Sequence, residues 1–303
     1  MTVVPAVRPE IRIVEVGPRD GLQNEAQTLP TATRAAFIEA LLDAGLRTVE
    51  AGSFVSPRWV PQMADTAAVL AALPRRPGVF LPVLVPNMQG FAAARDAGAP
   101  EVAVFGAASE AFSRRNTNCS VAESLDRFRP VCAAAAEAGI RVRGYVSCVL
   151  GCPYEGAVAP GRVAAVAEAL AAMGWYEVSL GDTIGGGTPL QARAMLRTVA
   201  RSVPMPRLAL HFHDTCGQAL ANILACLEAG AAVVDAAAGG LGGCPYAAGA
   251  SGNVATEDLV YMLDGMGVET GVSLDGVLGA ARLAAAALNR QHSSRLSRAR
   301  SGT

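Results

Sequence analysis

The chain has 303 residues, of which 51% are hydrophobic, a size and composition that allow one large core and are typical of a single-domain α/β barrel. Its formal net charge of −1 is dispersed along the chain, so the composition favours a small-molecule ligand over a nucleic acid or a membrane surface. All 25 basic residues are arginine, which excludes Schiff-base aldolase chemistry and phosphate loops that require lysine.

The seven cysteines are odd in number and show no CxxC spacing, as is typical of a reduced cytosolic protein. The first residues lack the charged region and apolar run of an export signal. The longest uncharged run, residues 236–256, is interrupted by six glycines and a proline, which makes it a poor membrane helix. We therefore expect a cytoplasmic protein without a membrane span.

Short β-branched runs alternate with longer segments of helical period, the pattern of parallel strands joined by crossover helices. The expected strands are Ile11–Val16, Thr48–Ala51, Val79–Val85, Glu101–Phe105, Arg141–Ser147, Glu177–Leu180, Leu208–Phe212 and Val233–Ala236. These eight units predict a TIM (β/α)8 barrel. A doubly wound sheet is the rival fold, but the first strand is followed by the sequence GPRDG and not by GxGxxG.

Local signals predict where the helices begin and end. Thr31 is expected to cap a helix over Thr33–Ala44 that ends at Gly45, and glycines at positions 98, 139, 174 and 230 are expected to precede strands. After a barrel over about residues 8–255, we expect helical segments near 256–265 and 274–289. A polar tail over 291–303, frayed at its end, completes the predicted single domain.

Side chains capable of chemistry follow the predicted strands, where the active sites of such barrels lie. They are Arg19, Asp20, Glu50, Ser53, Asp182, His211, His213, Cys244 and Asn253. The two histidines point the same way, because side chains on a strand alternate between its faces. With Asp20 and Asn253 they offer carboxylate, amide and imidazole ligands for Mg²⁺ or Mn²⁺. Zn²⁺ is a less favoured alternative, kept open by Cys244 in the same loop.

Each of these residues also has a structural interpretation. The histidines could be hydrogen-bonded side chains at a strand end, while Asp20, which precedes a glycine, and Asn253 could be turn residues. Glu50 could pair with an arginine inside the barrel. Cys244 could be buried and inert. Alternation turns Asp214 away from the histidine pair, which favours either a capping role for it or a supporting role behind the metal ligands.

Several longer stretches are specific enough to compare with known families. They are EVGPRDGLQNE (15–25), SFVSP (53–57), FGAASE (105–110), GYVSC (144–148), GCPYEG (151–156), SLGDTIG (179–185), HDT (213–215), GGCPYA (242–247) and GASGN (249–253). In these stretches the chain closely resembles the 3-hydroxy-3-methylglutaryl-CoA (HMG-CoA) lyase family, part of a wider group of metal-dependent barrel lyases, aldolases and synthases. The resemblance runs nearly end to end.

The resemblance implies retro-Claisen cleavage of an HMG-CoA-like thioester to acetyl-CoA and a 3-oxo acid, acetoacetate in the parent case. It implies that the divalent metal binds the alkoxide oxygen and the free carboxylate of the substrate, since a Lewis acid lowers the pKa of the hydroxyl group. The metal ligands implied by the family are Asp20, His211, His213 and Asn253.

The resemblance also implies roles for the residues around the metal. Arg19 would stabilise the thioester oxygen as it becomes an enolate, and Cys244 would protonate the enolate carbon. The proton of the hydroxyl group would pass to Asp20 or His211, an alternative that the sequence leaves open. Glu50 and Asp182 would orient Arg19 and the substrate.

Contacts with the CoA part of the substrate are assigned by the same resemblance to Ser53, Asn289 and Arg290. The family further implies a homodimer and a place in leucine degradation or ketone body metabolism, with another branched-acid route also open. The chain lacks the lysines that the family commonly carries at positions 26 and 291, and it also differs at Gly186, Phe212 and Cys216. A longer or more branched 3-hydroxy-3-alkylglutaryl-CoA is therefore an alternative substrate.

Two other functions are weighed against the lyase. A synthase of the same group would condense acetyl-CoA with a 2-oxo acid, but it would usually carry a further C-terminal domain, and this chain ends near residue 300 with Cys244 in place. A non-catalytic binding barrel would have lost a metal ligand or the thiol, and every one of these residues is present.

Overall fold

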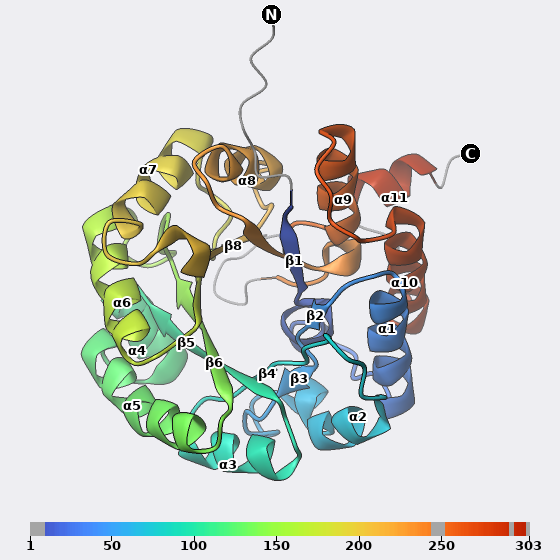
Figure 1. The fold of residues 1–303 in the computed structure, drawn as a ribbon, viewed down its shortest axis with the longest axis horizontal. Helices are drawn as coiled ribbons and strands as arrows, with labels where there is room; N and C mark the ends of the chain where they lie inside the picture. The colour runs from blue at the N-terminus through green and yellow to red at the C-terminus, as the bar shows by residue number, and fades with distance from the viewer. Residues whose placement is uncertain (1–9, 244–251, 291–293, 301–303) are drawn as a thin grey trace, which may run out of the picture.

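The structure is a computed structural model that describes residues 10–243, 252–290 and 294–300, and it shows a ring of parallel strands surrounded by helices (Figure 1). The strands are β1 (Arg12–Glu15), β2 (Thr48–Val49), β3 (Gly52–Ser53), β4 (Val83–Leu84), β5 (Glu101–Ala107), β6 (Arg141–Ser147), β7 (Glu177–Asp182), β8 (Leu208–Phe212) and β9 (Val233–Ala236). The helices are α1 (Thr31–Asp43), α2 (Thr66–Ala72), α3 (Met88–Asp96), α4 (Glu110–Thr117), α5 (Val121–Glu137), α6 (Pro160–Ala172), α7 (Pro189–Val199), α8 (Ala219–Leu227), α9 (Thr256–Gly265), α10 (Leu274–Ala287) and α11 (Arg295–Arg300).

The sheet closes on itself. Its strand order is β2-β1-β9-β8-β7-β6-β5-β4-β3, and β2 and β3 are consecutive pieces of one barrel position. Between these two pieces, the Glu50 amide donates to the Glu15 carbonyl at 2.8 Å on one side, and the Ala51 amide donates to the Pro82 carbonyl at 2.9 Å on the other. The predicted TIM barrel is therefore confirmed, with β2 and β3 together filling one of its positions.

Three strands are shorter than predicted. The first, expected over Ile11–Val16, spans Arg12–Glu15. Of the expected strand Thr48–Ala51 only Thr48–Val49 forms a strand, β2, and β3 begins beyond it at Gly52, because the backbone pairs with β1 first and then with β4. The expected strand Val79–Val85 is reduced to β4, since Pro82 has no amide to donate and interrupts the ladder. Phe80 keeps a single bridge to Thr48.

The predicted turns are confirmed at four glycines, whose φ angles of +73° (98), +66° (139), +91° (174) and +107° (230) lie in the left-handed region. The predicted cap of the first helix is wrong. Thr31 is the first helical residue and Pro30 stands at the N-cap, because proline already holds the φ that starts a helix. The Thr31 hydroxyl donates to Asp65 at the start of α2.

The two helices predicted after the barrel are present as α9 and α10. The polar tail, expected to be frayed, forms helix α11 against α9 in its described part. The reason is a carboxylate at the helix start: Asp258 accepts hydrogen bonds from the amides of Arg295 at 3.1 Å and Leu296 at 2.9 Å.

The apolar core lies mainly between the strands and the outer helices, and a second, much smaller cluster lies inside the barrel. The inner cluster consists of Leu84, Ala103 and Tyr145. Much of the remaining interior is charged, with Arg143 and Asp235 both almost completely buried. Among the described helices, none is long and apolar enough to cross a membrane.

One glycine is required by packing between the barrel and its helices. A Cβ on Gly144 in β6 would lie 1.5 Å from the indole ring of Trp175. Trp175 is fully buried, and its indole nitrogen donates to Cys132 Sγ at 3.1 Å. The ring therefore fills the space that a side chain at position 144 would need.

We predict that Gly144→Ala lowers the free energy of unfolding by about 1–3 kcal/mol or more, because a close-packed core cannot take the added methyl group without displacing the indole. Denaturant unfolding measures this change. Gly161→Ala in α6 is the matched control: a Cβ there meets no atom within 4 Å, so stability should be unchanged or slightly raised. Equal stabilities of the two variants would contradict this packing argument.

Candidate active site

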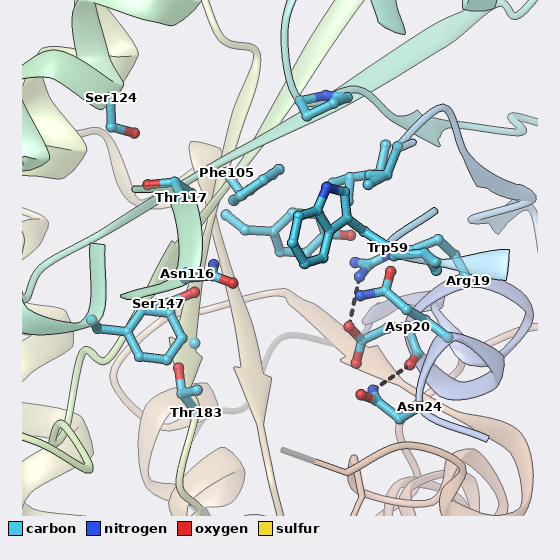
Figure 2. Close-up of a pocket in the computed structure, with 18 of the residues that line it drawn as sticks. Arg19, Asp20, Asn24, Trp59, Phe105, Asn116, Thr117, Ser124, Ser147 and Thr183 are labelled. Carbon is cyan, nitrogen blue, oxygen red and sulfur yellow. Dashed lines mark hydrogen bonds and ion pairs between the residues drawn. The ribbon is translucent and has the colours of Figure 1, made fainter. Parts of the chain in front are cut away.

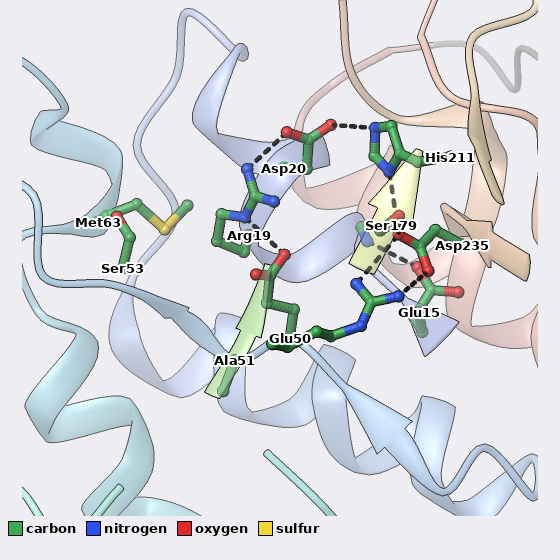
Figure 3. Close-up of polar contacts among 12 residues, drawn as sticks. Glu15, Arg19, Asp20, Glu50, Ala51, Ser53, Met63, Ser179, His211 and Asp235 are labelled. Atoms are coloured by element: carbon green, nitrogen blue, oxygen red, sulfur yellow. Dashed lines mark hydrogen bonds and ion pairs between the residues drawn. The ribbon is translucent and has the colours of Figure 1, made fainter. Parts of the chain in front are cut away.

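The loop after β1 brings a cation and a carboxylate to the C-terminal end of the barrel. Residues Gly17–Gly21 form a single turn of π-helix that carries Arg19 and Asp20. Arg19 Nε donates to Glu50 Oε2 and its Nη1 donates to Asp20 Oδ1, both at 2.6 Å (Figure 3). A Cβ on Gly21 would lie 2.6 Å from Leu241 Cβ, so this glycine allows the turn to pack closely against the loop after β9.

Asp20 lies beside the two histidines of the β8 end. One ligand atom from each of Asp20, His211 and His213 lies within 4.8 Å of the other two. Asn253 joins this group through its side chain, whose Nδ2 donates to Asp20 Oδ2 at 2.8 Å. The Oδ1 atom of Asn253 and the Nδ1 atom of His213 are buried and have no hydrogen-bond partner in the described part of the chain.

The charge states of this group suit a hard divalent cation. Burial opposes the ionisation of Asp20, but Arg19 and the two imidazoles outweigh it and lower its pKa from 3.8 to about 2. Burial lowers the pKa of His213 from 6.5 to about 4, so its imidazole is neutral at pH 7. An anionic oxygen, imidazole nitrogens and an unpaired amide oxygen are the donors that Mg²⁺ or Mn²⁺ accepts, so the residues present fit a metal ion.

His211, His213 and Arg19 line a cavity of about 860 Å³. Figure 2 shows part of its lining, including Arg19, Asp20 and Trp59. Its inner part is lined by Arg19, Asp20, His211 and Tyr145, and its wall includes Phe105 and Phe128. Its mouth is lined by Trp59, which is 84% exposed, and by two cations, Arg115 and Arg127. The cavity therefore joins a polar end to an apolar wall and a basic rim, which suits a long anionic ligand with a reactive polar head.

The other residues singled out from the sequence lie in different surroundings. Glu50 contacts Arg19, as expected. Asp182 does not contact Arg19 within the described residues, because alternation along β7 puts Gly181 opposite His211 and turns Asp182 to the other face. The Oδ2 atom of Asp182 accepts from the Gly187 amide at 2.9 Å. Burial raises the pKa of Asp182, and this effect exceeds the lowering caused by hydrogen bonds from backbone amides.

The residues expected near CoA are not in the described cavity lining. Arg290 pairs with Glu25, and Ser53 Oγ is buried without a hydrogen-bond partner among the described atoms. Asn289 has a left-handed φ of +48° after helix α10.

Cys244 lies outside the described residues, and the residue before it, Gly243, lines the cavity. The neighbouring Asp214 accepts from the amide of Ala219 at 3.0 Å at the start of α8, which confirms its predicted capping role.

Sequence reasoning did not single out three buried residues that surround His211. Tyr145 stacks edge-on to the His211 ring at 5.7 Å, with Arg19 5.3 Å and Arg143 5.0 Å from its own centroid. Asp235 Oδ2 lies 3.3 Å from His211 Nδ1. An acidic residue within the otherwise apolar run VVDA was the available signal for Asp235, since a charge in a barrel strand must find a partner inside.

Comparison with known proteins gives closely similar relatives over nearly the whole chain. The family model described as HMGL-like matches residues 10–283. The mitochondrial hydroxymethylglutaryl-CoA lyase of Bos taurus is 58% identical over 96% of this chain and 89% of its own length. The cytoplasmic 3-hydroxy-3-methylglutaryl-CoA lyase of Rattus norvegicus is 56% identical over 95% of this chain and 84% of its own length. The crystal structure of the hydroxymethylglutaryl-CoA lyase from Pseudomonas aeruginosa superposes with a TM-score of 0.96 at 54% identity, covering 98% of this chain and 99% of that one.

We predict that His213→Ala weakens Mn²⁺ binding by roughly 100-fold or more. Removing a residue that only hydrogen-bonds to a metal ligand already lowers metal affinity by about 10–100-fold, and removing the ligand itself should lower it at least as much. Isothermal titration of the purified protein with MnCl₂ measures this effect. Asp214→Asn is the control: it changes the next residue, whose carboxylate binds the start of α8, and it should leave the affinity unchanged. Wild-type affinity in His213→Ala would remove this residue from the metal site.

Proposed function

Because this chain belongs to the HMGL-like family, we propose that it cleaves 3-hydroxy-3-methylglutaryl-CoA to acetyl-CoA and acetoacetate by a retro-Claisen reaction that depends on a divalent metal ion. It is a carbon–carbon lyase. The observation that carries the proposal is the cluster of Asp20, His211 and His213 beside Arg19 at the inner end of a cavity of about 860 Å³. Such a volume lies in the range of small-molecule and cofactor sites.

The metal ion is Mg²⁺ or Mn²⁺ in this proposal, with Asp20, His211, His213 and Asn253 as its ligands. When bound, it supplies a Lewis acid that lowers the pKa of the tertiary hydroxyl group of the substrate. The support from the chain is its donor set: an ionised carboxylate, two imidazoles and an amide oxygen that has no other partner among the described residues.

Arg19 is preorganised to stabilise the negative charge that develops during cleavage. When the carbon–carbon bond breaks, its electron pair moves into the thioester, which becomes an enolate. Glu50 and Asp20 hold the guanidinium of Arg19 from two sides, so the charge is fixed in place before the reaction starts. Asp182, which is turned away from Arg19, would act through the segment after β7, whose Gly187 amide it binds.

Two proton transfers complete the reaction. The hydroxyl proton passes to Asp20 or His211, and we propose the Cys244 thiol as the acid that protonates the enolate carbon to release acetyl-CoA. Cys244 follows Gly243, which lines the cavity. Asp20 and His211 are proposed metal ligands, whereas the Cys244 thiol is not. The thiol is therefore free to donate its proton to the enolate carbon once the carbon–carbon bond has broken.

The remaining features of the proposal concern the rest of the substrate and the protein. Ser53, Asn289 and Arg290 remain the residues proposed to contact the CoA moiety, and since none of them is in the described cavity lining, this requires the ligand to reach beyond that lining. The chain is proposed to act as a single-domain homodimer, to be tested by sedimentation. A cytoplasmic location is supported by the named cytoplasmic relative and by the free state of the cysteines that the structure describes.

We predict that purified protein reconstituted with Mg²⁺ or Mn²⁺ converts HMG-CoA to equal amounts of acetyl-CoA and acetoacetate, and that chelation abolishes this activity. A coupled assay of both products measures the stoichiometry. Analogues with longer 3-alkyl groups, tested in parallel, define the acyl group for which the site is built. Failure to cleave any of these thioesters with either metal would overturn the lyase assignment.

Replacing the proposed acid separates catalysis from metal binding. We predict that Cys244→Ser lowers kcat by roughly 10²–10⁴-fold, because a hydroxyl group is a much weaker acid than a thiol. Its Mn²⁺ affinity should equal that of the wild type. Cys216→Ser, which changes an exposed cysteine, is the matched control and should retain normal turnover. Near-normal kcat in Cys244→Ser would exclude this thiol from the mechanism.

A further inference from the structure

We propose that Asp235 is a positioning residue that selects the ring tautomer of His211, so that Nε2 is the free nitrogen that faces the metal site. The proposal rests on the function proposed above. Asp235 lies on β9, is 1% exposed, and touches neither the cavity nor the other proposed ligands in the described structure. It would act only through His211. Because both ring nitrogens of His211 would then be engaged, the hydroxyl proton would pass to Asp20, the other acceptor named in the proposed function.

The geometry around the imidazole ring defines which nitrogen faces which carboxylate. Nδ1 of His211 lies 3.3 Å from Asp235 Oδ2, and Nε2 lies 3.9 Å from Asp20 Oδ2 (Figure 3). An imidazole that donates its Nδ1 proton to one carboxylate keeps the lone pair of Nε2 on the opposite side. This lone pair is directed toward Asp20, where the proposed metal would bind.

Asp235 can serve only as an acceptor in this position, because its carboxylate is ionised beside a buried guanidinium and has no proton to give. Arg143 donates Nη2 to Oδ1 at 2.6 Å and Nη1 to Oδ2 at 3.1 Å. Ser179 donates its hydroxyl to Oδ2 at 2.8 Å. In the longer contact of 3.3 Å between Oδ2 and Nδ1 of His211, the ring would therefore be the donor.

The same contacts make the carboxylate hard to replace. An asparagine at position 235 would place an NH₂ group on one side, facing either the guanidinium of Arg143 or Nδ1 of His211. The first orientation sets two donors against each other. The second sets the NH₂ group against Arg143 Nη1, and it also requires Nδ1 of His211 to accept, which moves the ring proton to Nε2 and blocks the nitrogen that should bind the metal. Both orientations weaken the preorganised ligand.

Asp235 could alternatively serve only to neutralise Arg143 inside the barrel. Arg143 has a second buried carboxylate partner, Glu177, whose Oε1 accepts from its Nε at 2.7 Å. Glu177 lies on the far side of the guanidinium and does not contact His211 in the described structure. This difference provides a matched pair of isosteric variants, Asp235→Asn and Glu177→Gln, that each remove one partner of the same buried arginine.

Isothermal titration calorimetry of the purified full-length variants with MnCl₂ distinguishes a residue that positions His211 from one that only neutralises Arg143. We expect Asp235→Asn to raise the Kd for Mn²⁺ by ~10–100-fold, the usual cost of losing the partner behind a metal-binding histidine. Glu177→Gln should keep the wild-type Kd even if its stability falls. At saturating Mn²⁺ the KM for HMG-CoA in Asp235→Asn should return to the wild-type value. Equal Mn²⁺ affinities in Asp235→Asn and the wild type would overturn the proposal, as would equal losses in both variants.

A second measurement is made on the wild-type protein, and a variant serves only to identify a signal. The chain contains three histidines, so long-range ¹H–¹⁵N spectra of the metal-free wild type contain three imidazole signals, and His211→Gln identifies the one from His211. We expect the Nδ1–H tautomer for His211, and an Nε2–H tautomer would overturn the proposal. Wild-type protein that binds no Mn²⁺ or cleaves no HMG-CoA would instead refute the proposed function, and the tautomer measurement would still stand.

Discussion

The structure depends on the pairing of charges that the barrel buries. The guanidinium of Arg143 is fully buried and is held by carboxylates from β7 and β9, at 2.7 Å from Glu177 and 2.6 Å from Asp235. An ion that loses its partner in such a place costs several kcal/mol, because the charge can neither reach water nor move. None of these buried charges can be removed alone without leaving another unpaired. The side chain of Arg143 also links β6 to β7 and β9.

This polar interior is possible because stability comes from elsewhere. The large apolar cluster lies between the strands and the surrounding helices, and the buried members of the cluster inside the barrel are, among the described residues, only Leu84, Ala103 and Tyr145. The interior is thus free to hold groups chosen for chemistry, in agreement with the usual placement of function at the C-terminal ends of barrel strands. The cavity begins where the interior charges end, at Arg19 and His211.

The sequence alone predicted the features that depend on local spacing. Alternation along β8 was sufficient to bring His211 and His213 to one face, and the eight strand-like runs were sufficient for the barrel. The same rule, applied to β7, would have turned Asp182 away from Arg19, and the expectation of their contact came from resemblance. Asp235 could not be assigned from spacing, because its partners lie on β6, β7 and β8 and depend on the register of three strand pairs. The division of one strand into β2 and β3 likewise depends on which neighbours are available to pair.

The two interpretations of Glu50, an interior ion-pair partner or a part of the site, describe the same contact. Glu50 neutralises Arg19, which is 5% exposed, and by doing so it fixes the direction of the guanidinium that faces the substrate cavity. Asp20 extends this link, since its Oδ1 accepts from Arg19 while its Oδ2 accepts from Asn253 and faces His211. One carboxylate thus sets the distance between the cation and the proposed metal ligands. The adjacent positions of Arg19 and Asp20 in a tight π-turn follow from this requirement, because a longer separation in the chain would let the two charges move independently.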